Sequence, residues 1–570
     1  MTERFDVEER AWPLRPWIMA AIGAVGGLVI HLLTNEHYYD TPFPVWKQAA
    51  IVFTAVSVLS FLLTVELRRW LWSVGFAVGW GAVAALVGWF TAQYNRVGTL
   101  FEFPFLSGIM AVLLAAPLFQ TIRDEGAWRF PYARLHRHAW TDAVIGAASL
   151  FFTGITFLLC WLIASLFNVI GIEAVKDLLE EEWFSWMLAG FAFGGALGIL
   201  RERDALLATL QKLVMIVLAV LAPVLSVALA AFLLSLPFTG LDGLWESDIP
   251  ATPMLLLSGA GAFVLVNAVI GDGREEKSAN AWLRRAALVL ALCILPLAIL
   301  AALSMGERIN QYGWTPERMW AVVAVGIAIA YGATAWWAVF KGRQEFDEPL
   351  RPLQTKLAIG LCGLALFLAL PILDFGAISA RSQLARLHSG KVTAEEFDWT
   401  AMAFDFGPEG RERLAEISST GPVSLRKFAK FALTNEDRAT VFMKSAGLAQ
   451  AARLDRYLRV LSPDIQLTDA LKSELTGYNG CNDKPCALLR LDKDRLLLIS
   501  NPYDGPVHSR IINLATLRPD TPDPNKPKAR DGIAVLRAEK VDLRRANIEV
   551  RTVQRRQLYV DGKPVDDPFE

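Results

Sequence analysis

Charged residues are scarce in this sequence, and they are unevenly distributed. They make up 20% of the 570 residues, whereas soluble domains average about a quarter. Residues 375–570 nevertheless hold 31 Lys and Arg and 27 Asp and Glu, so the first 374 residues are much poorer in charge. The net charge of −1 argues against nucleic-acid binding, because proteins that bind nucleic acids carry basic surfaces. The composition therefore predicts a membrane-embedded part followed by a water-soluble part.

Recognisable catalytic and cofactor motifs are also absent. The sequence contains no G-x-x-x-x-G-K-[ST], no H-E-x-x-H and no G-x-S-x-G, which mark P-loop proteins, zinc proteases and serine hydrolases. A D-x-D pair can bind a metal, but Asp492-Lys-Asp494 lies at a predicted turn, where Asp is an ordinary residue. We therefore predict no catalytic site, no cofactor and no metal centre, and the sequence favours a protein that is not an enzyme.

Cysteine is rare, and three of the five cysteines lie inside apolar runs, where they act as small apolar residues. Cys481 and Cys486 are separated by four residues that include Pro485, a spacing that a disulfide can close. Such a pair is usually oxidised outside the cytoplasm. Free thiols are an alternative, and so is half of a metal site, which would need His388 or His508 as further ligands. We predict a disulfide.

Long apolar runs, by contrast, are abundant, and the mean hydropathy is +0.36. A helix that crosses a bilayer needs about 20 apolar residues, and a helix satisfies its own backbone hydrogen bonds inside lipid. The runs predict an all-α polytopic membrane domain with about eleven transmembrane helices; ten and twelve are the alternatives. The predicted spans are 17–34, 48–66, 70–91, 103–119, 143–170, 183–200, 208–236, 253–270, 286–305, 319–340 and 356–373.

Lysine and arginine in the predicted loops indicate how the spans are oriented. The N-terminus and the even-numbered loops carry 19 of these residues, and the odd-numbered loops carry 5. Because cytoplasmic loops are enriched in Lys and Arg, residues 1–16 should be cytoplasmic and the chain after eleven spans periplasmic. No cleavable signal precedes the first span. We expect a multi-pass protein of the bacterial inner (plasma) membrane.

Two stretches of the membrane domain align without gaps. Lys212–Pro223 and Arg285–Pro296 each place a basic residue eleven positions before a proline. Each unit then reaches a Thr-Pro pair, Thr252-Pro253 or Thr315-Pro316, and Thr favours the N-cap while Pro favours the first helical turn. We predict a tandem repeat of two-helix hairpins, with chance similarity among apolar runs as the alternative.

Glycines four residues apart occur in two of the spans. One span contains Gly75 and Gly79, and another contains Gly190, Gly194 and Gly198. Small residues at this spacing let helices approach each other closely. We expect close helix packing at both places.

The charged part changes its periodicity along the chain. A helical neck over 375–460 is predicted, with helices at 377–388, 394–402, 410–418, 425–433 and 435–448. Alternation then predicts strands at 487–491, 495–500, 533–538, 548–553 and 557–560. The domains are thus 1–16 as a cytoplasmic N-terminus, 17–374 as the transmembrane domain, the neck, and 461–570 as a small β-rich end. The neck and the end together form a small α+β extracytoplasmic domain.

Several short motifs carry a resemblance to a known family. They are Gln311-Tyr-Gly-Trp-Thr-Pro-Glu-Arg318, Ile378-Ser-Ala-Arg-Ser-Gln-Leu-Ala-Arg386 with Ser389-Gly-Lys-Val392, and Phe397-Asp-Trp399 with Phe404-Asp-Phe-Gly407. Together they resemble the bacterial integral membrane family catalogued as domain of unknown function 4153. The resemblance covers the membrane domain and the start of the charged part. It implies a polytopic fold and a membrane location, and it implies no reaction because the family has no assigned activity.

The first of these motifs also has a physical interpretation. Gly313 permits a tight turn, Thr315 caps the next helix, and Arg318 lies in its first turn, where a cation opposes the helix dipole. We expect an anion to compensate Arg318: Asp374 at the end of the last span, Glu307, or a lipid phosphate. A purely structural role is the alternative. The candidate motif residues are Tyr312, Gly313, Trp314, Thr315, Pro316, Arg318 and Asp374.

Two classes of function remain open from the sequence. The repeat favours a transporter or a lipid-handling protein, because transporters often contain internal repeats. The large outer domain and the lack of charge at the middle of the spans favour a membrane-anchored cell-envelope factor whose periplasmic domain binds a partner. The expected partners are therefore the lipid bilayer and either an envelope protein or a small-molecule or lipid substrate, with no nucleic acid.

Overall fold

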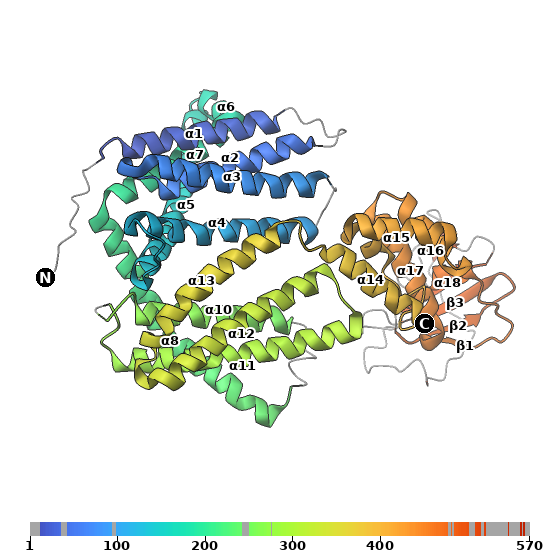
Figure 1. The fold of residues 1–570 in the computed structure, drawn as a ribbon. Coiled ribbons are helices and arrows are strands. Elements are labelled where there is room, and N and C mark those ends of the chain that lie inside the picture. Colours follow the sequence, from blue (N-terminus) through green and yellow to red (C-terminus); the bar gives the residue numbers. More distant parts are fainter. Residues whose placement is uncertain are drawn as a thin grey trace. The chain divides into compact units, whose positions relative to one another are not determined.

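A computed structural model gives the fold of this chain (Figure 1). It describes residues 12–35, 43–93, 99–241, 250–274, 276–476, 480–481, 484–500, 508–514, 518–519, 545, 559–560 and 563–564. The chain divides into two compact units. The membrane unit comprises Met1–Gln383 with Asp405–Glu409, and the C-terminal unit comprises Leu384–Phe404 with Gly410–Glu570.

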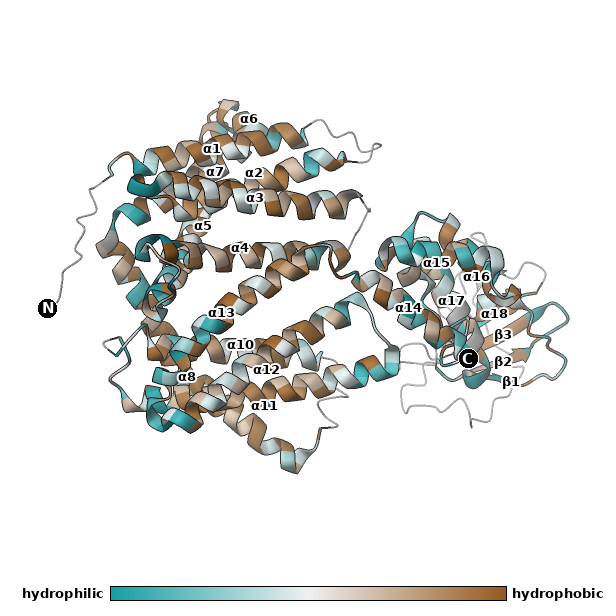
Figure 2. Ribbon diagram, viewed as in Figure 1, coloured by the Kyte–Doolittle hydropathy of each residue, from teal (hydrophilic) through white to brown (hydrophobic). Residues whose placement is uncertain are grey.

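Within the described residues, eleven helices of the membrane unit are long and apolar enough to cross a membrane. They confirm the eleven predicted spans, and apolar residues run along their length in Figure 2. The chain is thus a multi-pass membrane protein. The helices are α1 (Arg15–Thr34), α2 (Val45–Thr64), α3 (Trp70–Gln93), α4 (Thr99–Glu125), α5 (Tyr132–Val169), α7 (Glu182–Glu202), α8 (Asp204–Thr239), α10 (Ala251–Ile270), α11 (Ala281–Tyr312), α12 (Pro316–Gly342) and α13 (Asp347–Ala369). The short α6 (Ala174–Glu180) precedes α7.

Helices α1–α7 form a first bundle with its own apolar core. Met19, Leu62, Ile145 and Leu197, from α1, α2, α5 and α7, are buried together in this core. Helices α1 and α7 touch backbone to backbone, because a Cβ atom at Gly23, Gly190 or Gly194 would overlap a carbonyl oxygen of the facing helix.

The glycine predictions therefore have opposite outcomes. Gly190, Gly194 and Gly198 all lie against the backbone of α1, as the spacing predicts. A Cβ at Gly75 or Gly79 in α3 would meet no described atom within 4 Å, so the prediction of close packing is wrong there. The spacing alone does not show whether a second helix faces the glycines.

The second bundle contains α8 and α10–α13 around another apolar core, which includes Ala222, Leu255, Leu290 and Leu350. The two predicted repeat units are helix pairs, α8 with α10 and α11 with α12, and α8 and α11 each contain the matched proline.

One detail of the repeat differs from the prediction. Thr252 does not cap α10, which begins one residue earlier with Pro250 at the N-cap. The Thr252 hydroxyl instead donates to Ser304 Oγ of α11 at 3.1 Å. A buried contact with the neighbouring helix thus takes the place of the cap.

The two bundles meet at both ends of the membrane unit. Along α4 and α13, the Ser107 hydroxyl donates to the Ala365 carbonyl oxygen at 2.8 Å. At the end where the arginine-rich loops lie, Arg137 of α5 pairs with Asp272 beyond α10 at 3.1 Å, and the Tyr132 hydroxyl donates to Asn267 Oδ1 at 3.1 Å.

The C-terminal unit combines short helices with a mixed sheet. Its helices are α15 (Gly407–Thr420), α16 (Val423–Thr434), α17 (Arg438–Tyr457) and α18 (Asp469–Leu475), and α14 (Phe375–His388) begins in the membrane unit. The strands β1 (Leu458–Val460), β2 (Cys486–Arg490), β3 (Arg495–Ser500) and β4 (His508–Asn513) lie in that order, and the two-residue β5 (Arg518–Pro519) pairs with β4. Strand β1 is parallel to β2, and the other pairs are antiparallel.

Several predictions in this unit have different outcomes. The helices at 377–388, 410–418 and 425–433 and the strands at 487–491 and 495–500 are confirmed to within three residues, and the helix at 435–448 is found as α17, which ends nine residues later. The helix at 394–402 is wrong: turns occupy most of it, and a π-helical segment, Ala401–Asp405, follows. The strands at 533–538 and 548–553 lie outside the described residues, and the last one appears as β6 (Tyr559–Val560), paired with β7 (Lys563–Pro564).

The physical reason for the lost helix is the burial of Trp399. Its indole Nε1 donates to the Ala394 carbonyl oxygen at 2.7 Å, and its ring stacks on Phe428 of α16 at 5.6 Å. This anchor closes the segment into a turn, so the apolar residues that suggested helical spacing are core contacts instead.

Candidate functional site

The motif Gln311–Arg318, called here the signature turn, connects α11 to α12. Gly313 follows the last residue of α11 with φ 76°, a conformation that glycine adopts without steric cost. Thr315 is the N-cap of α12 and its hydroxyl accepts from the Arg318 backbone N–H at 3.4 Å. Pro316 is the first residue of the helix. The local structure of the turn is the one that its sequence predicts.

Arg318 finds carbonyl partners at the end of the preceding helix. Its guanidinium donates to the Gly313 carbonyl oxygen at 2.6 Å and to the Tyr312 carbonyl oxygen at 3.2 Å. It also lies over the Tyr312 ring, 5.4 Å from the ring centre. The C-terminus of a helix carries partial negative charge, so α11 supplies part of the compensation. Asp374 caps α14 by accepting from the Ala377 N–H at 2.9 Å, and its pairing with Arg318 stays a prediction.

The second motif binds the signature turn directly. Gln383 Nε2 in α14 donates to the carbonyl oxygens of Tyr312 at 2.9 Å and Trp314 at 3.0 Å. The Trp314 backbone N–H donates to the Ser382 hydroxyl at 3.3 Å. Ser382 and Gln383 belong to the motif Ile378–Arg386, which is 60 residues further along the chain. Sequence reasoning quoted this motif but did not connect it with the turn, because hydrogen bonds between distant segments leave no periodic signal.

The third motif closes the same region of the membrane unit. A Cβ atom at Gly376, in the first turn of α14, would overlap the Phe406 carbonyl oxygen. Phe406 is buried, and Gly407 has φ 67°. The signature turn, the start of α14 and residues 405–409 therefore form one packed region, in which only glycine fits at position 376.

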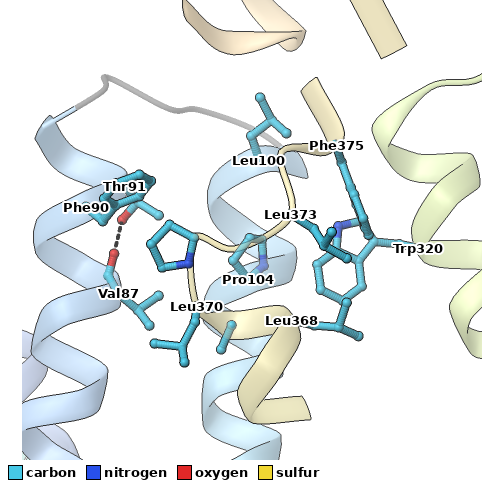
Figure 3. A pocket seen from close by; sticks show the side chains of 12 residues that line it. Val87, Phe90, Thr91, Leu100, Pro104, Trp320, Leu368, Leu370, Leu373 and Phe375 are labelled. Carbon is cyan, nitrogen blue, oxygen red and sulfur yellow. Dashed lines mark hydrogen bonds between the residues drawn. The ribbon is translucent and has the colours of Figure 1, made fainter. Parts of the chain in front are cut away.

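An apolar cavity of about 30 Å³ lies beside this region. Trp320 of α12 stands at one side of it, stacked on Phe103 of α4 at 5.6 Å and edge-on to Phe375 of α14 at 5.3 Å. Figure 3 shows how side chains from both bundles and from the link between α13 and α14 surround the cavity. The lining residues are Val87, Phe90, Thr91, Leu100, Pro104, Trp320, Leu368, Ala369, Leu370, Pro371, Leu373 and Phe375.

Among the lining side chains, polar groups are confined to Thr91 and the indole of Trp320. The hydroxyl of Thr91 donates back into its own helix, to the Val87 carbonyl oxygen at 2.9 Å. The cavity lies where α3, α4, α12, α13 and the start of α14 meet.

Buried ion pairs hold each bundle together at the arginine-rich end. In the first bundle, Arg123 pairs with Glu66 and also donates to the Thr64 carbonyl oxygen at 2.6 Å, while Asp142 lies 3.8 Å from Arg201. Breaking one partner of such a buried pair leaves an uncompensated charge and is strongly destabilising. These groups therefore fix the geometry of this end.

The second bundle has a similar ion network. Asp347, which is fully buried, lies between Lys277 and Arg351. Arg351 also donates to the Ile270 carbonyl oxygen at 2.8 Å. In the adjoining loop, burial raises the pKa of Glu276, and the nearby Asp272 carboxylate raises it further. The count of loop charges includes Lys277 and Arg351 only as basic residues, although Asp347 pairs with Arg351 on the same helix and with Lys277 from the loop after α10.

Other candidate residues lie in the C-terminal unit. Cys481 and Cys486 are buried and joined by a disulfide with a Cα–Cα distance of 5.5 Å. Asp492 accepts from Arg495 across the β2–β3 turn, as expected for a turn residue. Within the part of the chain that the structure describes, no group of three or more His, Cys, Asp or Glu residues could hold a metal ion.

Comparison with known proteins places these motifs in a family. Residues 49–416 match the family described as "Domain of unknown function (DUF4153)". No curated protein and no solved structure matches the chain. The matched stretch is more than half of the chain and contains the signature turn, the α14 motif and residues 397–407. The chain therefore belongs to the DUF4153 family.

Proposed function

We propose that this protein is a membrane-anchored cell-envelope factor of the bacterial inner membrane, whose C-terminal unit lies in the periplasm and binds a partner there. The observation that carries the proposal is the attachment of α14 to the signature turn by Ser382 and Gln383. Three family motifs hold the first part of the helix that leads into the C-terminal unit. Their packing supports a membrane unit that serves as a platform for that helix.

The surface of the C-terminal unit supports a binding role. Phe442 and Met443 on α17 are 59% and 72% exposed, although this unit is rich in charge. Neighbouring exposed apolar side chains on a charged unit are typical of interaction sites.

The test uses the full chain in living cells, with a photo-reactive phenylalanine placed at Phe442 or Met443. Glu412 on α15, which is also exposed, is the matched control position. We expect a discrete protein adduct from α17 and none from position 412. Gln383→Ala should lower the yield of the adduct, whereas Ser389→Ala, at an exposed position near the end of the same helix, should leave it unchanged. The same adducts from all three positions would refute the proposal.

A second candidate function is supported by the division of the membrane unit into two bundles with separate cores. Transporters often move one bundle against another around a site where they meet, so transport or lipid handling is the alternative. Spin labels on Leu32 of α1 and Leu303 of α11 would report on such motion in proteoliposomes. Two distance populations between Leu32 and Leu303 would favour transport or lipid handling, provided that the control pair inside the second bundle, Leu257 and Leu303, shows one population. One narrow population for both pairs would count against it.

A further inference from the structure

An open hollow of about 350 Å³ lies where α1 ends and α6 and α7 meet, far from the signature turn in sequence. Helices α1 and α7 bring the two walls together because their glycines allow backbone contact (Figure 1). One contact, between Gly27 and the Trp186 carbonyl, lies one helical turn from the hollow. The lining residues are His31, Asn35, Asp177, Glu180, Glu181, Glu182 and Trp183.

His31 supplies a buried acceptor at this hollow. Its side chain is only 6% exposed, and Nδ1 has no hydrogen-bond partner among the described residues. The nearest carboxylate oxygen, Glu182 Oε2, lies 3.9 Å away, which is too long for a hydrogen bond. A buried imidazole nitrogen without a partner is costly, so this atom, in the tautomer with the hydrogen on Nε2, is suited to a ligand that donates a hydrogen bond to it.

The charge of the hollow is strongly negative. It is lined by Asp177, Glu180, Glu181 and Glu182, and their described basic neighbours are Lys176, 3.6 Å from Glu180, and His31, 3.9 Å from Glu182. The Glu182 side chain is 75% exposed. The carboxylates are therefore accessible and attract a cation.

The geometry distinguishes an organic cation from a metal ion. Calcium and magnesium need several oxygen ligands around one point, and the described residues form no such group. A protonated amine has looser requirements, because each N–H needs one acceptor. Two acceptors 3.9 Å apart, such as His31 Nδ1 and Glu182 Oε2, can share one nitrogen at distances of about 2.9 Å. Trp183 offers an aromatic ring, which attracts ammonium groups.

We propose that this hollow binds a primary ammonium group, held by His31 and Glu182 and surrounded by the other carboxylates. The group can belong to a free amine or to the ethanolamine headgroup of a lipid, since the hollow lies at the ends of membrane-spanning helices. The proposal is separate from the proposed function, and it does not depend on which side of the membrane the hollow faces.

The first test measures thermal unfolding of the full chain in a maltoside detergent during titration with ethanolamine, choline or magnesium chloride at equal ionic strength. We expect ethanolamine to raise the melting temperature most, because choline has no N–H to donate to His31. Glu182→Gln, an exposed and isosteric change, should weaken ethanolamine about tenfold, because the neutral amide oxygen accepts a weaker hydrogen bond from an ammonium than the carboxylate does. Glu173→Gln, at an acidic residue outside the lining, is the matched control and should have no effect.

A second variant tests the role of the imidazole. His31→Leu keeps an apolar side chain in the buried position but removes the acceptor, so the preference for ethanolamine over choline should disappear. Glu182→Gln remains informative if His31→Leu does not fold. Equal responses to ethanolamine and magnesium, or equal effects of Glu182→Gln and Glu173→Gln, would overturn the proposal.

Native mass spectrometry distinguishes the two sources of the ammonium group. Retention of phosphatidylethanolamine over phosphatidylcholine, lost in Glu182→Gln but kept in Glu173→Gln, would assign the site to a lipid headgroup. A response to free ethanolamine without this lipid preference would assign it to a soluble amine. If the protein shows neither the lipid preference nor a response to free ethanolamine, the proposed site is refuted.

Discussion

Arg318 carries a positive charge that is unfavourable beside the dipole of α12, and the C-terminal end of α11 compensates it. A cation in the first turn of a helix is unfavourable by roughly 0.3–1 kcal/mol. In the signature turn, the guanidinium donates to the last carbonyl oxygens of α11, where the partial charge is negative. The sequence predicted the need for compensation but named only acidic side chains and lipid phosphate as partners.

The pairing of Arg318 with Asp374 remains a prediction that a double-mutant cycle can test. Asp374→Asn removes the charge but keeps an oxygen to cap Ala377, so it is preferable to alanine. If the two charges interact, Arg318→Ala and Asp374→Asn should each lower the melting temperature in detergent, and the double variant should lose little more than either one. Additive losses would show that the residues are not coupled.

The contact between α1 and α7 predicts a large effect from a single methyl group. A Cβ at Gly194 would overlap the Met19 carbonyl oxygen, so Gly194→Ala must push the helices apart. We expect a loss of about 1–3 kcal/mol in the free energy of unfolding, as for other overpacked cores. Gly79→Ala, where a Cβ meets no described atom within 4 Å, is the control. Equal melting temperatures for the two variants would contradict the packing.

For single residues, a prediction from the sequence was correct where the interacting residues are close together in the chain, and interactions between distant residues were missed. Gly313 and Thr315 were predicted correctly because turn and cap preferences involve only neighbours in sequence. Gln383 and the Asp142–Arg201 pair were missed because their partners come from elements far away in the chain. A polar residue near a predicted helix end looks the same in sequence whether it faces water or another helix.

The disulfide stabilises the start of a central strand. Cys486 is the first residue of β2 and is in register with both Leu458 of β1 and Ser500 of β3. Replacing both cysteines with serine should cost about 2 kcal/mol, since the closed loop is short. Mass spectrometry without reduction should find the peptide lighter than its reduced form by two hydrogen atoms. Complete labelling of the unreduced protein by a thiol reagent would contradict the bond.

The N-cap of α17 predicts a dependence on pH. Asp437 accepts from the Thr440 side chain and from the backbone N–H groups of Thr440 and Ala439, and these bonds lower its pKa below the ordinary 3.8. Because the folded-state pKa is the lower one, the stabilisation is present above about pH 4 and disappears as the pH falls through the folded value. Asp437→Asn keeps an N-cap oxygen but does not titrate. Between pH 5 and pH 3, the melting temperature of this variant should therefore fall less than that of the wild type.

The predictability of whole elements depended on how local their signal is. All eleven long helices were predicted, because the hydropathy of about 20 consecutive residues is sufficient. Strands β1 and β4 were missed: β1 has only three residues, and β4 is stabilised by pairing along the whole of β3. The residues around Trp399 were predicted as a helix because burial in a turn and burial on a helix face use the same apolar residues.

For the whole molecule, the orientation remains a prediction from the loop charges. With 19 basic residues on one side and 5 on the other, alkaline phosphatase fused after Glu570 should be active in the periplasm. A fluorescent protein exported by the same general secretory route should stay dark. The opposite pair of results would place the C-terminal unit in the cytoplasm and would remove the reason to expect an oxidised cysteine pair.

The arrangement of the helices was less predictable than their number. The repeat predicted that α8 with α10 and α11 with α12 form hairpins, which is local information. The contact of α4 with α13 and the meeting of three motifs at α14 depend on which helices lie side by side in the bilayer. Apolar surfaces are interchangeable in lipid, so hydropathy alone does not specify helix neighbours.

The backbone contact between α1 and α7 has a consequence for biogenesis. The ribosome completes α1 about 170 residues before α7, a delay of about 10 to 35 seconds at usual rates of synthesis. During this time α1 lacks the helix whose backbone its Gly23 and Gly27 contact in the folded protein. The first bundle therefore cannot assemble strictly in the order of translation, because α1 reaches its final contact only after α7 has been made.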